Sequence, residues 1–279
     1  MRVLCTDQDN KNVVKDLLLI GKGEFQATND KINIKSFFNS VPTITKLIQN
    51  VYPNIQNKSL KWFQERAILS PTNEQVGKLK DLILSRFDAQ PQMYYLVDTF
   101  LEKEDAVHFP IEFLNSLTPS GVPPHTLILK IGAPIILMRN LSPPTLCNGT
   151  KLQIKKFRSL LLECIILTGC GNGKIVLIPR IPIIPSDLPF KFKRIQFPVK
   201  LAFAMTINKA QGQTLNVAGI DLSVQCFSHD QLYATLSRVT SKFNLYIFAP
   251  DPEKVYNVVY KEIFELSKYC HNSYLWFHP

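Results

Sequence analysis

The segment "AMTINKAQGQTLN", residues 204–216, gathers hydroxyl, amide and ammonium side chains around a Gln-Gly-Gln turn. It lies between two apolar runs, "FPVKLAFA" and "VAGIDLS", which are typical of buried strands. A chain does not usually place so many hydrogen-bonding groups between two buried strands unless they contact a partner, and the glycine leaves the main chain unobstructed beside them. The pattern therefore predicts a binding loop between the two strands.

Two other expected element ends carry polar side chains that could bind a ligand. Thr72 and Asn73 follow an expected strand, and ligands gather at the carboxyl ends of parallel strands; the alternative is a plain helix N-cap. Arg238 ends an expected helix, and a fixed guanidinium offers planar, two-point donors that a lysine cannot reproduce. The alternative for Arg238 is a charge that stabilises the C-terminal end of its own helix.

Alternating strands and helices are expected to position these residues. The sequence predicts a strand over residues 66–70, a turn at Pro71, and then a helix with one apolar face. That face would consist of Val76, Leu79, Leu82 and Ile83. After Pro198 the expected order is a strand in "VKLAFA", a short helix, a strand in "VAGIDLS", a helix in "SHDQLYATLSRV" with Ser228 and Gln231 as a capping box, and a last strand in "NLYIFA". Such alternation indicates a parallel sheet with helices on its faces.

Other regions add helices and a β module. Helical spacing predicts one helix that ends at Gly21 and another from near Pro42 to just before Pro53. From Thr126 onward, short runs rich in Ile and Leu are separated by Gly, Pro and Asn turns, which indicates a small, mostly antiparallel β module. The expected fold class is α/β, with this module inserted into a parallel-sheet domain.

Composition limits the classes of partner. The 279 residues carry a net charge of +10, which favours anionic partners: nucleic acid, nucleotide phosphates or an acidic membrane surface. The alternative is a merely basic solvated surface. The first residues show no signal peptide, and no apolar stretch is long enough to span a bilayer, so no membrane partner is expected. The six cysteines show no CxxC; we expect free, reduced thiols, with a zinc site from Cys147, Cys164 and Cys170 as the alternative.

A Walker A phosphate loop is the obvious motif to seek in a basic α/β protein. The nearest string is "GCGNGKI", residues 169–175, whose glycines are too close together and whose Ile175 stands where a Ser or Thr should bind Mg²⁺. It lies between two β-like runs, so we expect a hairpin turn. No strand ends in the Asp-Glu of a Walker B motif.

The strings "FPVKLAFAMTINKAQGQTL" and "FSHDQLYATLSRVTS" resemble motifs V and VI of superfamily-one DNA helicases. They are most similar to the Pif (petite integration frequency) family and to the Pif-like helicase domain of Helitron transposons. "ILSPTNEQV" resembles motif IV, and "PIEFLNSLTPSGVPPHTLILKIGAPIILMRNL", "LCNGTKLQI" and "VLIPRIPIIPSDLPFKFKRIQFPV" resemble the Helitron-type second motor domain with its insert. The resemblance covers roughly residues 60–262.

The resemblance implies a RecA-like parallel-sheet domain with a small β-barrel-like insert. Its parts would be a helical segment leading in from a missing first motor domain (1–59), the second RecA-like domain in two pieces (60–126 and 197–262), the insert (127–196) and a tail (263–279). Walker A and B belong to the missing domain, so Met1 would be an internal methionine of a longer product.

The resemblance also implies roles for single residues. Arg238 would face the ATP γ-phosphate as the motif VI arginine, and Arg2, in "MRV", would match a second arginine that faces it. Gln211 and Gly212 would contact nucleotide. The expected DNA contacts are Thr72, Asn73, Thr206, Asn208, Lys209 and Gln213. For Lys209, a solvated helix residue without a DNA contact is an equal alternative. Asn208 stands where many Pif relatives have His.

The implied function is the C-terminal part of a 5′-to-3′, ATP-dependent DNA helicase that is inactive alone. The alternative is a non-catalytic module, or transposon relic, that binds single-stranded nucleic acid. ATP and Mg²⁺ would be cofactors of the full-length protein, with none held by this chain alone. The expected partners are single-stranded DNA and the missing N-terminal RecA-like domain, in a monomer located in the nucleus.

Overall fold

The computed structural model describes residues 8–25, 27–28, 30–35, 38–56, 58–101, 110–117, 119, 121–185, 188, 190–239 and 241–262. Arg2 and the tail 263–279 lie outside these residues. Contacts divide the chain into two compact units, each described here by itself. The first comprises residues within 1–54, 65–79 and 204–279, and the second comprises residues 55–64 and 80–203.

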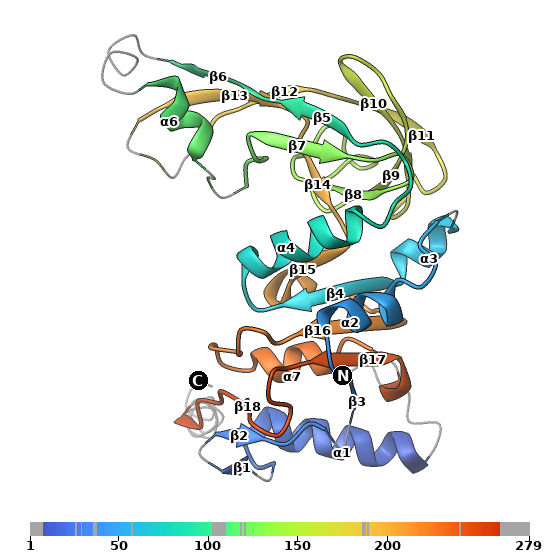
Figure 1. Ribbon diagram of the computed structural model, residues 1–279, viewed down its shortest axis with the longest axis vertical. Helices are drawn as coiled ribbons and strands as arrows, with labels where there is room; N and C mark the ends of the chain where they lie inside the picture. The colour runs from blue at the N-terminus through green and yellow to red at the C-terminus, as the bar shows by residue number, and fades with distance from the viewer. Residues whose placement is uncertain are drawn as a thin grey trace, which may run out of the picture. The chain divides into compact units, whose positions relative to one another are not determined.

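A parallel sheet forms the centre of the first unit (Figure 1). Its strand order is β15-β4-β16-β17-β3, and every neighbouring pair runs parallel. The strands are β15 (Ala204–Thr206), β4 (Arg66–Ser70), β16 (Val217–Asp221), β17 (Leu245–Phe248) and β3 (Asn39–Ser40). Since β15 and β4 are adjacent but distant in sequence, their ends bring two separate loops together.

Helices cover both faces of this sheet. On one face α2 (Ile44–Val51) approaches so closely that a Cβ built on Gly219 would lie 2.8 Å from a methyl of Val51. On the other face, the apolar core joins the strands to α1 (Gln8–Lys22) and α7 (Gln231–Leu236), through residues such as Leu17 and Leu232. Burial of apolar surface on both faces is what a parallel sheet requires.

The first unit has further short elements. A second sheet contains β1 (Ala27–Thr28), β2 (Lys31–Ile32) and β18 (Val255–Tyr256) in antiparallel pairs. Helix α4 (Asn73–Leu84) follows β4, and its residues from Lys80 belong to the second unit. Two 3₁₀ turns are η1 (Ile207–Ala210) and η2 (Lys242–Asn244).

The second unit is mostly antiparallel. Its largest sheet has the order β11-β10-β9-β8-β14, and smaller sheets are β12-β13-β6 and β5-β7. Two helices, α3 (Leu60–Gln64) and α6 (Ile111–Ser116), belong to it. The strands are β5 (Gln92–Tyr95), β6 (Val97–Phe100), β7 (Thr126–Leu129), β8 (Pro134–Leu137), β9 (Lys151–Phe157), β10 (Leu161–Ile166), β11 (Ile175–Pro179), β12 (Ile181–Ile183), β13 (Phe192–Gln196) and β14 (Val199–Leu201).

The α/β fold class is confirmed, with one parallel sheet and several antiparallel ones. The expected turn in "GCGNGKI" is also present, because it joins β10 to β11 with Gly169 and Gly173 both at φ +84°. Within the described part of the chain, every helix is too short or too polar to cross a lipid bilayer.

Several local predictions were wrong. The run "VKLAFA" is not one strand: β14 pairs with β8 in an antiparallel sheet, and β15 begins separately in the parallel sheet. Ser228 does not cap α7, because the N-cap is Asp230 and the Gln231 side chain instead accepts a hydrogen bond from the Phe227 amide. Leu82 is 49% exposed, and β17 is followed by another strand, β18.

Candidate nucleotide and nucleic-acid site

Two of the predicted segments leave neighbouring strands of the parallel sheet at the same edge. Thr206, the last residue of β15, is in register with Ser70, the last residue of β4. Thr72 and Asn73 follow after Pro71, and the Thr72 hydroxyl oxygen accepts a hydrogen bond from the Gln75 amide at 3.4 Å. Thr72 therefore makes the contact of a helix N-cap, as the alternative interpretation expected, while Asn73 is exposed.

The polar loop after β15 is anchored by apolar residues and presents polar ones. Ile207 and Ala210 in η1 are buried, whereas Asn208, Lys209 and the following Gln211 are exposed. A chain reversal follows immediately, in which the Gln213 amide donates to the Ala210 carbonyl at 3.0 Å. The loop therefore holds its polar side chains on a fixed turn.

Gly212 and Gln213 complete this loop. Gly212 has φ +82°, a conformation that other residues rarely adopt, and a Cβ built there would meet no atom within 4 Å. The Gln213 side chain donates from Nε2 to the Lys209 carbonyl at 3.2 Å. An open glycine between two amide side chains suits close approach of a ligand to the backbone.

Arg238 lies directly after α7 and is tied to the polar loop through the main chain. The Leu215 amide donates to the Arg238 carbonyl at 3.0 Å, and Leu215 forms a parallel bridge with Val239. The guanidinium folds back on its own helix: Nε donates to the Ala234 carbonyl at 2.6 Å and Nη2 to the Ser237 hydroxyl at 2.8 Å. The half-buried side chain thus adopts the helix-end arrangement that was the alternative to a phosphate contact.

Sequence reasoning missed two buried polar groups at the same sheet edge. Ser70 and Asp221 end the adjacent strands β4 and β16, and both are 0% exposed. Among the described residues no hydrogen-bond partner reaches Ser70 Oγ or Asp221 Oδ2, while Asp221 Oδ1 accepts from the Ser223 amide at 2.9 Å. The signal was an Asp that ends an apolar strand in "VAGIDLS".

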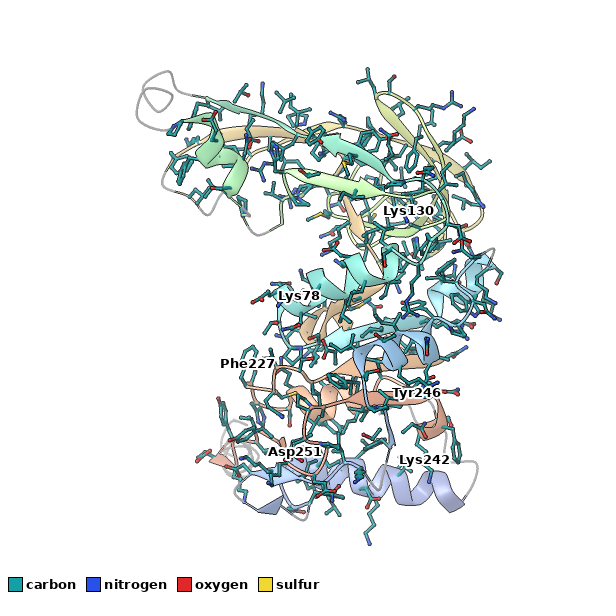
Figure 2. The ribbon with its side chains drawn as sticks, in the orientation of Figure 1. Lys78, Lys130, Phe227, Lys242, Tyr246 and Asp251 are labelled. Atoms are coloured by element: carbon teal, nitrogen blue, oxygen red, sulfur yellow. The ribbon has the colours of Figure 1, made fainter. Side chains whose placement is uncertain are left out.

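The first turn of α4 carries charges beside Asn73. Lys78, labelled in Figure 2, donates to Glu74 at 2.7 Å, and this contact holds the pKa of the exposed Glu74 carboxyl below its usual value. The pair neutralises the acidic charge nearest to the predicted site residues on this helix. No group of three His, Cys, Asp or Glu side chains able to hold a metal ion occurs among the described residues.

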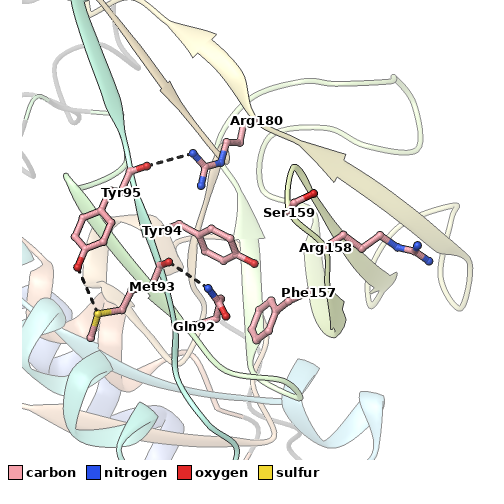
Figure 3. A pocket seen from close by; sticks show the side chains of 8 residues that line it. All are labelled: Gln92, Met93, Tyr94, Tyr95, Phe157, Arg158, Ser159 and Arg180. Carbon is pink, nitrogen blue, oxygen red and sulfur yellow. Dashed lines mark hydrogen bonds between the residues drawn. The ribbon is translucent and has the colours of Figure 1, made fainter.

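The second unit contains a separate pocket lined by aromatic and arginine side chains (Figure 3). It has a volume of about 510 Å³. The Arg180 guanidinium lies 5.3 Å from the ring centre of Tyr94 and donates to the Tyr95 carbonyl at 3.2 Å. Tyr95 is 59% exposed, and its ring points away from the Tyr94 ring, on the other side of β5 (Figure 3). Aromatic faces next to arginine are the groups on which single-stranded nucleic acid stacks.

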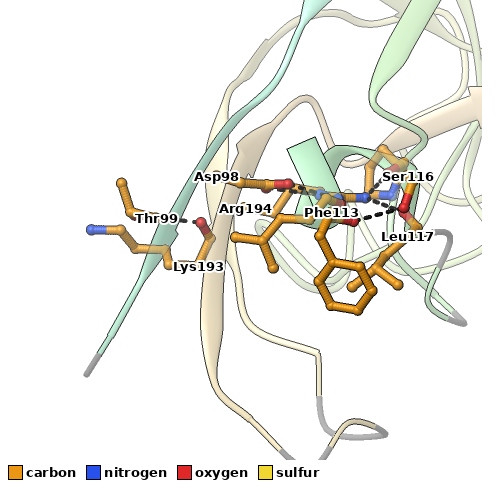
Figure 4. Close-up of polar contacts among 9 residues, drawn as sticks. Asp98, Thr99, Phe113, Ser116, Leu117, Lys193 and Arg194 are labelled. Carbon is orange, nitrogen blue, oxygen red and sulfur yellow. Dashed lines mark hydrogen bonds and ion pairs between the residues drawn. The ribbon is translucent and has the colours of Figure 1, made fainter. Parts of the chain in front are cut away.

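A buried ion pair connects distant segments of this unit. Arg194 on β13 donates to both carboxylate oxygens of Asp98 on β6, at 2.9 and 2.7 Å, and both side chains are 0% exposed (Figure 4). The remaining donors of Arg194 reach the carbonyls of Leu114, Leu117 and Pro123. One guanidinium thus joins a strand pair to the end of α6 and the chain that follows it.

Comparison with protein families gives a match to the family described as "DNA helicase Pif1, 2B domain". It covers residues 112–157, which lie within the antiparallel unit.

Curated relatives agree with this match. An ATP-dependent DNA helicase PIF6 of Trypanosoma brucei brucei is 32% identical over 139 residues, covering 47% of this chain and 17% of the relative. An ATP-dependent DNA helicase PIF1 of Emericella nidulans is 24% identical over 241 residues, covering 68% of this chain and 31% of the relative. The chain therefore spans less than a third of either protein.

Solved structures show the same fold over most of the chain. A crystal structure of Bacteroides Pif1 bound to ssDNA matches with a TM-score of 0.65 at 18% identity, covering 98% of this chain and 55% of that one. A crystal structure of Pif1 helicase from Candida albicans matches with a TM-score of 0.64 at 21% identity, covering 93% and 58%. The chain is therefore related to the Pif-type DNA helicases, and it spans part of their length.

Proposed function

We propose that this chain is the C-terminal part of a superfamily-one DNA helicase, carrying motifs IV, V and VI. The register between Thr206 and Ser70 is the observation that carries the proposal. It brings the segment that resembles motif V next to the one that resembles motif IV at one sheet edge. The hydrogen bond between Leu215 and Arg238 adds the segment that resembles motif VI.

The proposed roles follow from what each group offers. Arg238 would leave its helix-end contacts and turn its guanidinium toward the γ-phosphate of ATP, where planar donors stabilise developing charge. Gln211 and Gly212, exposed on the turn after η1, would contact the nucleotide. The polar groups proposed to contact DNA are Thr72, Asn73, Thr206, Asn208, Lys209 and Gln213.

The remaining parts of the helicase would come from elsewhere in the protein. ATP with Mg²⁺ would be held mainly by a first RecA-like domain, with Arg2 as a second arginine toward the phosphate. We propose 5′-to-3′ movement on single-stranded DNA by a nuclear monomer. The boundaries at residues 60, 127, 197 and 263 are likewise proposed as divisions between domains.

A second candidate function is a module that binds single-stranded nucleic acid without catalysis. The observation in its favour is that Arg180 lies against the Tyr94 ring in the pocket of the antiparallel unit, while the next residue, Tyr95, offers an exposed ring on the other side of β5 (Figure 3). Such a surface needs no ATP, because base stacking and phosphate contacts supply the binding free energy.

Fluorescence anisotropy of a labelled oligothymidine with the whole chain tests the proposal. We expect nonspecific binding, with Kd of ~10⁻⁴ to 10⁻⁶ M, and log K falling against log salt by ~0.7 per contacted phosphate. Lys209→Ala should weaken binding and reduce this slope. Lys254→Ala is the matched control, because Lys254 is also exposed in the first unit but is paired with Asp251 at 3.6 Å.

The two functions give different patterns. Loss of affinity on Lys209→Ala and not on Tyr95→Ala supports the helicase site. The reverse pattern supports the stacking module, and equal loss from Lys254→Ala would mean that overall charge alone attracts the DNA.

A further inference from the structure

Two cysteines far apart in the sequence meet at one carbonyl oxygen. The Sγ atoms of Cys147 and Cys170 each donate to the Pro144 carbonyl, both at 3.5 Å. The two sulfurs are therefore separated by no more than twice that distance. Both residues belong to the antiparallel unit.

Each thiol lies on a turn whose backbone is fixed. Cys147 is in the connection between β8 and β9, where its amide donates to the Thr150 hydroxyl at 3.1 Å and Ser142 forms an antiparallel bridge with Leu146. Cys170 is in the turn between β10 and β11, closed by the bond from the Gly173 amide to the Ile166 carbonyl at 2.9 Å. Neither thiol is carried on a loose segment.

The two turns also pack against each other. A Cβ built on Gly171 would lie 2.5 Å from Thr145 Cγ2, closer than side chains approach one another, so only glycine allows this contact. Gly171 follows Cys170, and Thr145 stands two residues before Cys147. The nearness of the two sulfurs is therefore part of the packing of this unit.

Cys147 and Cys170 are more accessible to reagents than the other described cysteines. Cys170 is exposed and Cys147 is half-buried, whereas Cys164 and Cys226 are buried. Burial raises the pKa of the Cys164 and Cys226 thiols to about 12, which keeps them protonated and unreactive near neutral pH. Among the described cysteines, the accessible ones are the two that meet.

We propose that Cys147 and Cys170 form an oxidisable dithiol that hydrogen peroxide converts to a disulfide across the two turns. The exposed Cys170 thiolate attacks one peroxide oxygen, the O–O bond breaks, and the products are Cys170 sulfenic acid and, after protonation, water. Cys147 then attacks the Cys170 sulfur, displacing the sulfenic oxygen as a second water and forming the S–S bond. Two thiols and one peroxide thus give one disulfide and two waters.

The bond would tie the connection between β8 and β9 to the β10–β11 turn. In a reducing compartment thiol reductants would reopen it, so the modification is a reversible response to peroxide. This role does not depend on ATP or DNA, and it stands apart from the proposed helicase site.

Peptide mass spectrometry of the full chain tests the proposal. The background variant Cys5→Ser/Cys270→Ser removes the two thiols outside the described residues. After hydrogen peroxide and alkylation, we expect one linked peptide pair containing Cys147 and Cys170, lighter by two hydrogens than the reduced pair and absent after treatment with a thiol reductant.

Single variants distinguish the thiol that peroxide attacks, Cys170, from the thiol that then forms the disulfide, Cys147. Cys147→Ser should leave a sulfenic acid on Cys170 that dimedone captures, because no resolving thiol remains. In Cys170→Ser, Cys147 should consume peroxide more slowly than Cys170 does in Cys147→Ser, since the half-buried thiol is the poorer target. Circular dichroism of each variant confirms that the fold is retained.

Three results would overturn the inference. They are the absence of the linked pair at peroxide levels that oxidise free cysteine, pairing of either residue with Cys164 or Cys226 instead, or equal dimedone capture at both positions in the background variant. The first two would mean that the shared carbonyl contact does not bring the sulfurs within bonding reach, and the third would mean that Cys170 is not the thiol that peroxide attacks first.

Discussion

The Leu215 amide donates a hydrogen bond to the Arg238 carbonyl at 3.0 Å, and this bond connects the end of the polar loop to the residue after α7. The neighbouring Val239 is 2% exposed and continues the contact as a parallel bridge to Leu215. The backbone of Arg238 is therefore fixed, and its guanidinium bonds the Ala234 carbonyl and the Ser237 hydroxyl. A fixed Cα with a rotatable guanidinium is what an arginine that responds to a ligand requires.

We predict that Arg238→Ala lowers ATP turnover by at least ~10²-fold in a protein that also contains the ATP-binding domain, a cautious share of what an arginine finger supplies. Nucleotide affinity should change far less, because ground-state binding would depend on that other domain. Single-turnover hydrolysis and nucleotide titration measure the two effects separately.

Arg238→Lys should rescue turnover poorly, because an ammonium cannot make the planar two-point contact. Lys254→Ala controls for the loss of one positive charge in the same unit. Near-normal turnover in Arg238→Ala would mean that Arg238 stabilises the helix end, where it bonds Ala234 and Ser237, and does not act on ATP.

We predict that the 279-residue chain alone does not hydrolyse ATP. The sequence has no phosphate loop, and the string closest to one is the β10–β11 turn of an antiparallel sheet. Phosphoryl transfer draws most of its charge stabilisation from a cradle of backbone amides, a lysine and bound Mg²⁺. Phosphate release by the purified chain, with and without oligothymidine, measures this, and DNA-stimulated turnover above a mock preparation would contradict it.

Replacing either of two glycines by alanine should change the free energy of unfolding, in opposite directions for the two positions. Gly212→Ala places a side chain at φ +82°, so we expect a loss of about 1–2 kcal/mol in the free energy of unfolding, without any clash. Gly77→Ala is the matched change in α4, where open space also surrounds the added Cβ and helix propensity should add about 0.5–1 kcal/mol. Urea titrations of both variants against the parent measure the shifts, and equal shifts would mean that the Gly212 conformation is not strained for alanine.

The parallel sheet and its polar edge were predictable because their signals are local. β4 and β16 are apolar runs bounded by turn residues, and the positions of Thr72 and Arg238 at element ends follow from helix and strand lengths. Parallel strands then bring their carboxyl ends to one edge whatever loops intervene.

What escaped prediction depends on distant partners. No local pattern marks the break of "VKLAFA" after Leu201, since both halves are apolar and only their sheet partners differ. The Ser228 capping box failed because Gln231 bonds the Phe227 amide instead. The meeting of Cys147 with Cys170 likewise depends on how two turns pack.

Arg194 and Asp98, 96 residues apart, are the strongest case of such a distant pair, and they carry the last prediction. In sequence both read as ordinary charged residues of a basic chain. In the fold, Asp98 occupies Arg194 Nε and Nη2, and backbone carbonyls accept from Nη1 and share Nη2. Removing one partner therefore leaves the other as a buried charge without compensation.

We predict that Arg194→Met lowers the free energy of unfolding by about 3–5 kcal/mol, because Asp98 then remains buried and unpaired. Asp98→Asn should cost less, since its amide oxygen can still accept from the guanidinium. The double variant Arg194→Met/Asp98→Leu removes both charges, and it should recover much of the loss because apolar replacements of buried pairs are often neutral.

Arg158→Met is the control: its pair with Glu163 has the same 2.7 Å distance, but 52% of the Arg158 side chain is exposed. That change should cost no more than about 1 kcal/mol. Urea titrations of all four variants decide the matter. If the double variant is as unstable as Arg194→Met, the carbonyl contacts of Arg194, and not its charge pairing, hold α6 to the strands.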